Sequence, residues 1–347
     1  MPTAPRTAVA VASVALLSVG FAPAAASGLH ERLEQCATIA TDAARLQCYD
    51  GIVGAHPGPV PPSGAGPPVP PPEPPLSHGL GAPSRLAEHW ELEPATRQGL
   101  FSIRLHRENY VLLTYSSNPN EAPYRPFASL VPGAGVVEPV ELAFQLGFKL
   151  KLAEAPLGAP MDLWFGYTQR SHWQIANPEA SNPFRATDYQ PELMAVFPVD
   201  ANVLGLRMRF LNLGIVHESN GQTATLSRSW NRVYVQAGFE RGNVSVLARA
   251  WQRFRVWEVD ENPDIVDYMG YGDVEVTLRR GQHDFSALAR YNLRTSRGAL
   301  QLGWAFPLTQ KAPNLKGYLQ FFSGYGYSLI DYNHRQNVLG IGLMIAQ

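Results

Sequence analysis

Short segments in which apolar and polar residues alternate follow one another from about residue 100 to the end of the chain. The clearest is 140–152, where the even-numbered positions are all Val, Leu or Phe and the odd-numbered ones are Glu, Ala, Gln, Gly or Lys. Because successive side chains of a strand point to opposite faces, such a segment is apolar on one face only. The segment 243–257 repeats the pattern and places Arg249, Arg253 and Arg255 on its polar face. Strands of this kind are typical of a transmembrane β-barrel, with lipid outside and a polar lumen inside.

The chain contains twelve segments with this alternation. They are 108–116, 140–152, 160–175, 187–198, 204–217, 230–240, 243–257, 269–280, 283–295, 298–306, 315–325 and 336–346. An even number is typical of a closed antiparallel barrel with both ends on the periplasmic side. We therefore predict an all-β fold, a twelve-stranded antiparallel transmembrane β-barrel over 96–347, whose own polar side chains fill the lumen. Barrels of this kind commonly finish on an aromatic residue, whereas this chain ends on Gln347, which leaves open how its terminus affects assembly.

The composition agrees with a membrane barrel and excludes two other classes. Charged residues are 16% of the chain, against roughly 25% in ordinary soluble domains. Beyond the N-terminal region the sequence has no run of about 20 apolar residues, which excludes a bundle of membrane-spanning helices. The formal net charge is -1 and the Lys and Arg residues are scattered, so we do not expect nucleic acid as a partner.

The first 26 residues have the features of an export signal. Arg6 supplies a positive charge, 9–19 is apolar, and Ala24 to Ala26 form a small-residue cleavage site. We predict a signal peptide over 1–26, cleaved after Ala26. Such a signal is consistent with a protein of the bacterial cell outer membrane.

Two further segments precede the predicted barrel and form a short periplasmic extension. Residues 27–55 have a helical composition and contain Cys36 and Cys48, which an exported chain usually pairs in a disulfide. Residues 56–95 are rich in proline and favour an extended linker. The sequence does not reveal what residues 27–95 do.

The candidate reactive residues continue an apolar stripe. The odd-numbered positions of 211–215 are Leu, Leu and Ile, and His217 and Ser219 lie on the same face of the predicted strand. Asn231 begins a second apolar face, which continues over 233–239. If the two strands form a hairpin, these three polar side chains converge at its end, on the outside of the barrel.

His217, Ser219 and Asn231 are the residue types that nucleophilic catalysis needs. A serine hydroxyl becomes a good nucleophile when an imidazole takes its proton, and a third group must orient that imidazole. Asparagine can do so without placing a charge on the lipid-facing surface, where a charge costs roughly 2–4 kcal/mol at the bilayer midplane. The tripeptide 217–219 alone favours a different interpretation, in which His217 and Ser219 are polar residues at the membrane interface without a catalytic role.

The longer sequence around these residues favours a catalytic role for His217 and Ser219. The strings 217–221 and 227–232 together resemble the active-site hairpin of the outer-membrane phospholipase A family. Further strings resemble the same family in the same order, and the resemblance covers roughly residues 98 to 347. They are 167–171, 182–185, 262–264, 268–271, 323–326 and 328–333.

The resemblance implies a calcium-dependent phospholipase with A1 and A2 activity. It implies that Ser227 binds Ca²⁺ through its hydroxyl, Gln222 through its carbonyl and Ser181 of a second subunit through another carbonyl. Gly221 is the predicted oxyanion residue. Gln222 departs from the arginine expected there, and because only its carbonyl would bind, we expect calcium use to survive with altered affinity.

The resemblance also implies a homodimer when active. Two barrels would pair along flat apolar sides, with the acyl chains of a phospholipid substrate between them. Gln169 is the predicted polar contact across the pair. Glu218 and Asn220 are expected to point inward and to support the active hairpin.

Two alternatives stay open at this point. The chain could be a catalytically inactive outer-membrane barrel, porin-like or adhesin-like, in which His217 and Ser219 are interface residues. It could also be an esterase that acts on other acyl lipids, because the sequence does not reveal the head-group or positional preference, nor what triggers dimerisation.

Overall fold

The computed structural model describes residues 26–53, 84–129, 135–256 and 260–346. The chain divides into two units, one within residues 1–77 and one within 78–347. Apart from Ala26, the predicted signal segment lies outside the described residues, as do most of the predicted linker and Gln347.

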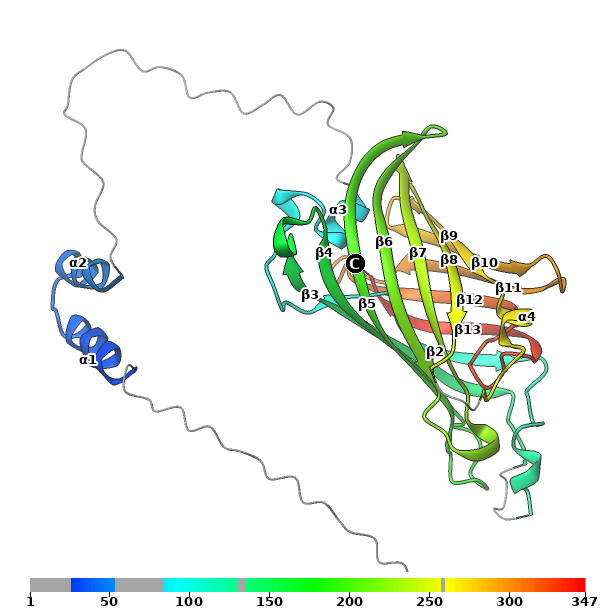
Figure 1. The fold of residues 1–347 in the computed structure, drawn as a ribbon. Coiled ribbons are helices and arrows are strands. Elements are labelled where there is room, and N and C mark those ends of the chain that lie inside the picture. Colours follow the sequence, from blue (N-terminus) through cyan, green and yellow to red (C-terminus); the bar gives the residue numbers. More distant parts are fainter. Residues whose placement is uncertain (1–25, 54–83, 130–134, 257–259, 347) are drawn as a thin grey trace, which may run out of the picture. The chain divides into compact units, whose positions relative to one another are not determined.

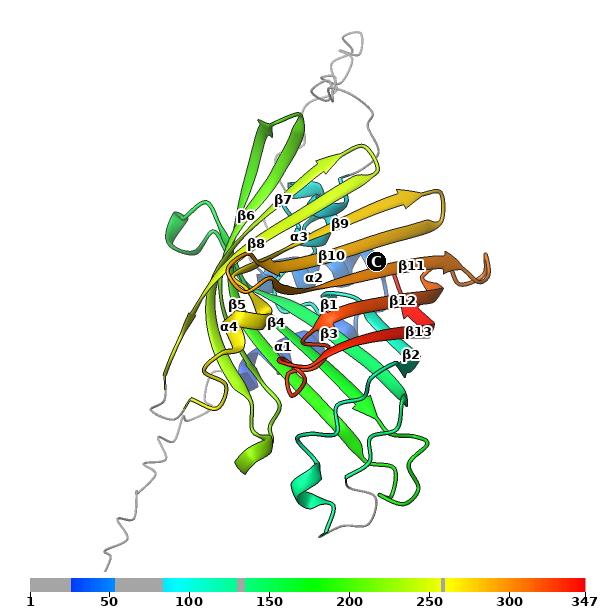
Figure 2. The ribbon, with the colours of Figure 1, turned by 90° about the vertical axis from the view of Figure 1, so that its right-hand side faces the viewer.

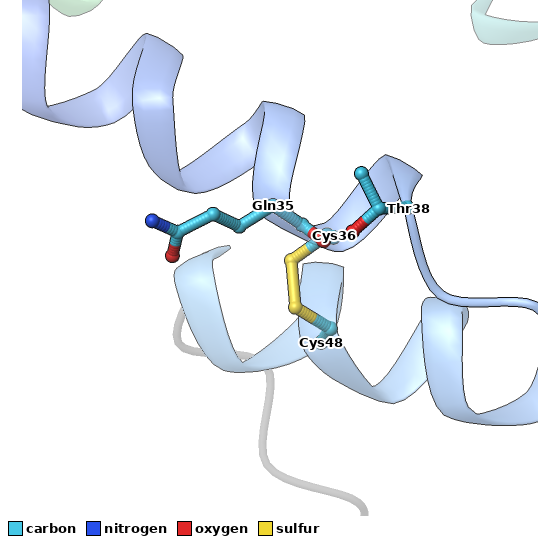
Figure 3. The surroundings of a disulfide bond; sticks show 4 residues. All are labelled: Gln35, Cys36, Thr38 and Cys48. Carbon is cyan, nitrogen blue, oxygen red and sulfur yellow. Dashed lines mark hydrogen bonds between the residues drawn. A yellow bond between two sulfur atoms is a disulfide. The ribbon is translucent and has the colours of Figure 1, made fainter.

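The first unit contains two helices, α1 (Ala26–Ala37) and α2 (Asp42–Val53). A disulfide between Cys36 and Cys48 joins them, which confirms the predicted pairing (Figure 3). Thr38 Oγ1 donates a hydrogen bond to the carbonyl of Gln35, 2.8 Å away, where α1 ends. A cross-link that closes so short a loop stabilises the fold by about 3 kcal/mol in the chain-entropy account. None of the described helices is long and apolar enough to span a membrane.

The second unit is a closed barrel (Figures 1 and 2). Among the described residues, twelve long strands each pair antiparallel with the next, and the last pairs with the first, which confirms the predicted fold. They are β2 (Asn109–Ser116), β3 (Val140–Glu154), β4 (Asp162–Trp173), β5 (Phe184–Val203), β6 (Leu206–Ser219), β7 (Ser229–Arg241), β8 (Val244–Phe254), β9 (Gly272–Arg280), β10 (His283–Asn292), β11 (Arg297–Pro307), β12 (Leu315–Tyr325) and β13 (Arg335–Ile345). A two-residue strand, β1 (Arg104–Leu105), adds to β3.

Short helical segments lie outside the strands. They are α3 (Arg85–Trp90), α4 (Ile265–Met269) and the 3-10 turns Pro94–Thr96, Arg125–Phe127, Pro156–Gly158 and Ala224–Leu226.

The loops give the barrel an orientation. Two-residue turns connect the strands at 204–205, 242–243 and 281–282, while the opposite end carries longer loops such as 174–183 and 255–271. Glycines in these turns have positive φ, for example +57° at Gly242, as tight hairpin turns require. Barrels of this class have short periplasmic and long extracellular connections. The N-terminal end of β2 is therefore periplasmic, and the end that carries His217 is extracellular.

Charged side chains line the lumen and pair with one another, around a cavity of about 500 Å³. Arg249 is bonded to Asp273, as its predicted place in the lumen requires, and Arg253 pairs with Asp260. Arg255 differs from the prediction, because β8 ends at Phe254 and Arg255 is exposed in the following loop.

A second charge cluster lies at the extracellular end of the lumen. Asp331, in the loop between β12 and β13, is fully buried, and Arg185 Nη1 lies 2.9 Å from its carboxylate. Burial raises the pKa of Asp331, but the positive charge of Arg185 and the Ser328 hydroxyl bring the pKa below its usual value. This ion pair ties the extracellular loop to β5.

The α3 helix packs against the barrel, although sequence reasoning assigned its residues to the linker 56–95. Ser84 caps α3 by accepting a hydrogen bond from the Ala87 N–H at 3.0 Å. Trp90, at the end of α3, is 3% exposed, and Lys149 Nζ lies 3.6 Å from the centre of its ring. Phe210 of β6 packs against the same indole. The folded barrel unit therefore begins by Ser84, before the expected boundary at residue 96.

Candidate active site

The outward faces of β6 and β7 carry the three predicted catalytic residues. His217 is directly opposite Asn231 in the strand register, and Ser219 is opposite Ser229. The outward neighbours of His217 further along β6 are apolar, and Ile215 is 46% exposed. The three residues therefore lie where the lipid-facing surface meets the extracellular end of the barrel.

His217 and Asn231 are held together by a hydrogen bond of 2.8 Å between Nδ1 and Oδ1. An amide oxygen can only accept, so the His217 Nδ1–H is the donor. A neutral imidazole protonated at Nδ1 keeps a lone pair on Nε2, which is the atom that a general base uses. Ser219 lies two residues further along β6, on the same face of the strand as His217.

The inward side of the same hairpin is fixed by Glu218. Its Oε2 atom accepts hydrogen bonds from Trp230 Nε1 at 2.8 Å, Arg232 Nη2 at 2.7 Å and Gln190 Nε2 at 3.2 Å. These partners come from β7 and β5, on either side of β6. Glu218 thus locks the three strands together directly behind His217 and Ser219, as expected from its parity.

Asn220 closes the loop between β6 and β7. It is 3% exposed, accepts from the backbone N–H of Arg228 at 2.9 Å and donates to the carbonyl of Leu226 at 2.8 Å. The next residue, Gly221, has a φ of +62°, and an added Cβ would lie 3.0 Å from the Tyr189 ring. This left-handed conformation favours glycine at the predicted oxyanion position.

The loop brings oxygen donors together. Ser227, one of the predicted calcium residues, donates its hydroxyl to Glu261 Oε1 at 2.6 Å. Ser229 donates to the other oxygen of the same carboxylate at 3.1 Å. Gln222 is exposed in the same loop, and its backbone N–H donates to Asn220 Oδ1 at 3.3 Å.

Sequence reasoning missed Glu261. The connection 222–229, which carries the predicted calcium residues of the same chain, contains no carboxylate, whereas Glu261 comes from the loop between β8 and β9. The acidic string 260–261 before Asn262 is the only sign in the sequence, and nothing in it indicates contact with Ser227. The Ser229 N–H also donates to Asn262 Oδ1 at 3.0 Å, so this loop is anchored to the start of β7.

The donor set fits calcium better than a transition metal. The described residues form no group of three His, Cys, Asp or Glu side chains that could hold a metal ion. A hydroxyl, a carboxylate and a backbone carbonyl are the hard oxygen donors that Ca²⁺ prefers. Within one chain they supply only part of the six to eight ligands that Ca²⁺ usually takes.

Ser181 and Gln169 lie apart from the catalytic hairpin. Ser181 is exposed in the loop between β4 and β5, with a φ of +63°. Gln169 lies on the outward face of β4, where its amide accepts from the Tyr167 hydroxyl at 3.0 Å and donates to Ser171 Oγ at 3.2 Å. Both residues are positioned where a second copy could reach them.

A shallow apolar groove runs along the lipid-facing surface below His217. Its volume is about 670 Å³. It is lined mainly by outward residues of β5 to β8, among them Leu193, Leu213, Ile215, Val233 and Val235. An apolar groove on the strands that carry His217 and Asn231 suits an acyl chain.

Comparison with known proteins identifies the family. The family model described as phospholipase A1 matches residues 86–345. Over 268 residues the chain is 45% identical to a predicted phospholipase A1 of Neisseria meningitidis serogroup B, covering 75% of this chain and 69% of that protein.

Two solved structures share the fold. The Salmonella typhi outer-membrane phospholipase dimer with bound calcium has a TM-score of 0.66 at 34% identity, over 74% of this chain and 95% of that one. An active-site mutant of Escherichia coli outer-membrane phospholipase A, with an asparagine replaced by alanine, has a TM-score of 0.66 at 36% identity, over 72% and 94%. With the family match over three quarters of its length, this chain belongs to the phospholipase A1 family of outer-membrane β-barrel hydrolases.

Proposed function

We propose that this member of the family hydrolyses the acyl ester bonds of glycerophospholipids, with A1 and A2 activity, through Ser219, His217 and Asn231. The hydrogen bond of 2.8 Å between His217 and Asn231, on the face of β6 that also carries Ser219, is the observation that carries this proposal. The asparagine that is altered in the Escherichia coli active-site mutant supports the same assignment.

In this mechanism Ser219 Oγ attacks the ester carbonyl while His217 Nε2 takes its proton. Asn231 holds the imidazole in the required tautomer and orientation. His217 then protonates the departing alcohol, and a water molecule, activated by the same nitrogen, releases the fatty acid from Ser219. Gly221, whose backbone N–H lies in the adjacent loop, is the proposed donor to the oxyanion.

Calcium is the proposed cofactor. When bound, it would supply positive charge near the developing oxyanion. Ser227 and the Gln222 carbonyl would hold it, together with Glu261, and Ser181 of a partner chain would complete the set. The Salmonella typhi relative, a dimer with bound calcium, supports both the ion and the pairing.

Dimerisation is the proposed control of activity. One chain offers too few oxygen ligands, so a second barrel that supplies Ser181 would tighten calcium binding and complete the site. The apolar groove below His217 would then be covered by the partner and would hold an acyl chain. Gln169 would stabilise the pair, because an amide keeps further donor and acceptor capacity beside its two bonds within the chain.

Fatty-acid release from glycerophospholipid in mixed micelles tests the proposal. We expect the parent protein to release fatty acid with calcium and to stop when calcium is chelated. Ser219→Ala should remove activity and leave a folded barrel. Ser323→Ala is the matched control, because this outward serine on β12 also lies near the extracellular end and bonds an asparagine, Asn337, at 2.7 Å. Equal activity of Ser219→Ala and Ser323→Ala would contradict the assignment, and hydrolysis of other acyl esters alone would indicate an esterase.

A further inference from the structure

Strands β10 and β11, which face the viewer in Figure 2, carry a row of aromatic rings on their outward face near the periplasmic end. The rings of Phe285 and Trp304, directly opposite in the register, are 6.0 Å apart and inclined by only 9°. His283 stacks on both of them, and Phe306 lies 5.1 Å from Trp304. In the strand order of the closed barrel, these strands are four places from β6 and β7, about a third of the way round the barrel.

Aromatic residues at a membrane boundary are common, but this row carries a polar arrangement at its periplasmic edge. Trp304 Nε1 donates a hydrogen bond to His283 Nδ1 at 3.1 Å. A neutral His283 therefore carries its proton on Nε2, which makes that nitrogen a donor. The two rings together thus present a hydrogen-bond donor at the edge of the lipid-facing surface.

Arg280 adds a positive charge at the same place. It is directly opposite His283 across the turn Gly281–Gln282, and the exposure of Val276 and Leu278 shows that even-numbered positions of β9 face outward. Among the described residues no carboxylate pairs with Arg280, whereas its neighbour Arg279 bonds Asp284 at 2.8 Å. Arg280 is thus an exposed cation beside an imidazole N–H.

An apolar groove begins at this edge. Its volume is about 470 Å³. The side chains that line it include Leu278, Phe285, Leu302, Trp304 and Phe321. A cation and a hydrogen-bond donor at one end of an apolar groove match the phosphate and the acyl chain of one molecule.

We propose that this face holds a glycerophospholipid of the periplasmic leaflet as a bound, non-reacting ligand, with its phosphate on Arg280 and His283 and an acyl chain in the groove. Its ester bonds would lie at the opposite membrane boundary from Ser219, separated from it by a hydrocarbon core of roughly 30 Å. A second copy of the chain is a poorer occupant. A two-fold contact would place the same patch on both sides and bring the unpaired Arg280 of each copy together.

Native mass spectrometry of the full-length protein in detergent tests this inference. The probe is an ether-linked phosphatidylglycerol, which has no ester to hydrolyse, and the comparison lipid is the matching dialkylglycerol, which has no phosphate. We expect the parent to retain the phosphate lipid more strongly than the dialkylglycerol. Arg280→Ala should weaken retention of the phosphate lipid about fivefold, the effect of one basic residue near a phosphate surface.

Arg241→Ala is the matched control. Arg241 ends β7 before Gly242 as Arg280 ends β9 before Gly281, and it also faces outward at the periplasmic end, but no ring row lies beside it. We expect retention by this variant to equal that of the parent, and His283→Ala to weaken retention as Arg280→Ala does. Heat-modifiable mobility on a gel reports whether each variant is folded.

Four outcomes would overturn the inference. Equal retention of the phosphate lipid and the dialkylglycerol would show that the face is covered only by unspecific lipid. An equal loss in Arg280→Ala and Arg241→Ala would show a general effect of surface charge. Displacement of the lipid by an excess of inorganic phosphate would show a phosphate site without a role for the groove. A dimer that Arg280→Ala breaks would show that a second copy of the chain, and not a lipid, covers this face.

Discussion

Asn231 makes the candidate site suitable for a lipid-facing surface. It orients His217 through a neutral amide, whereas a carboxylate at the same place would add a charge to an apolar face. The register alone brings Asn231 opposite His217, so the orientation of the imidazole is built into the β6–β7 hairpin.

At the residue scale we expect Asn231→Ala to reduce kcat for phospholipid hydrolysis without unfolding the barrel. The loss should be smaller than the roughly 10²- to 10⁴-fold contribution of a general base, because His217 stays in place and loses only its orienting partner. Asn337→Ala, which removes an outward asparagine from β13, is the control. If both variants keep the parent's kcat, another group orients His217.

The calcium residues give a second prediction at this scale. Ser227→Ala and Glu261→Gln should each raise the calcium concentration for half-maximal hydrolysis by about ten- to hundredfold, the range for losing one side-chain partner at a metal site. Gln222→Ala should change it little, because only its carbonyl is proposed to bind. Calcium titration of fatty-acid release measures all three variants. A large effect of Gln222→Ala would show that its side chain takes part.

At the element scale, the strands were largely predictable and α3 was not. The alternation placed β6 at 204–217 and β7 at 230–240, close to the observed Leu206–Ser219 and Ser229–Arg241. β5 extends well beyond the predicted 187–198, because the pattern breaks at a bulge after Pro198 although the pairing resumes. The burial of α3 depends on Lys149 and Phe210, which lie far away in the sequence.

Separation along the sequence also explains which features of the candidate site could be predicted and which could not. The parity of β6 and β7 places His217, Ser219 and Asn231 on one face from local sequence alone. The contact of Ser227 with Glu261 joins two loops 34 positions apart, and no local pattern encodes it. Residue roles such as calcium binding came from the family resemblance and remain proposals.

A prediction for α3 follows from its burial. Trp90→Ala should lower the free energy of unfolding by about 3–5 kcal/mol, the usual range when a buried tryptophan is truncated. Removal of residues 27–77 should leave both stability and hydrolysis unchanged, since Ser84 and α3 stay in place. Heat-modifiable mobility on a gel measures the stability of each variant, and fatty-acid release measures its hydrolysis. If removal of 27–77 abolishes hydrolysis in calcium-containing micelles, the disulfide-linked helices take part in activity.

At the scale of the whole molecule, the barrel presents two functional sides. The candidate catalytic hairpin lies on β6 and β7, while the proposed lipid site lies on β9 to β12, about a third of the way round the barrel. Pairing through the catalytic side would leave the other side in contact with lipid. The lumen is lined by paired charges and contains a cavity of about 500 Å³.

A substitution at Gln169 tests the proposed pairing of two barrels. Gln169→Leu should reduce the dimer fraction in calcium and a non-hydrolysable phospholipid about threefold, since a hydrogen bond between membrane segments averages about 0.6 kcal/mol. Analytical ultracentrifugation in density-matched detergent measures the dimer fraction. Ser323→Leu is the control, because Ser323 is an outward polar residue on β12 that does not line the groove below His217. An equal effect of both substitutions would mean that Gln169 has no special place in the dimer.

The central claim is that His217 activates Ser219. It is tested most directly by the mass of the intact protein after reaction with a fluorophosphonate in calcium-containing micelles. We predict a single adduct on the peptide that contains Ser219, absent from Ser219→Ala, slowed in His217→Ala and Asn231→Ala, and unchanged in Ser323→Ala. An adduct on another residue, or labelling of Ser219 at the parent's rate without His217, would contradict the account.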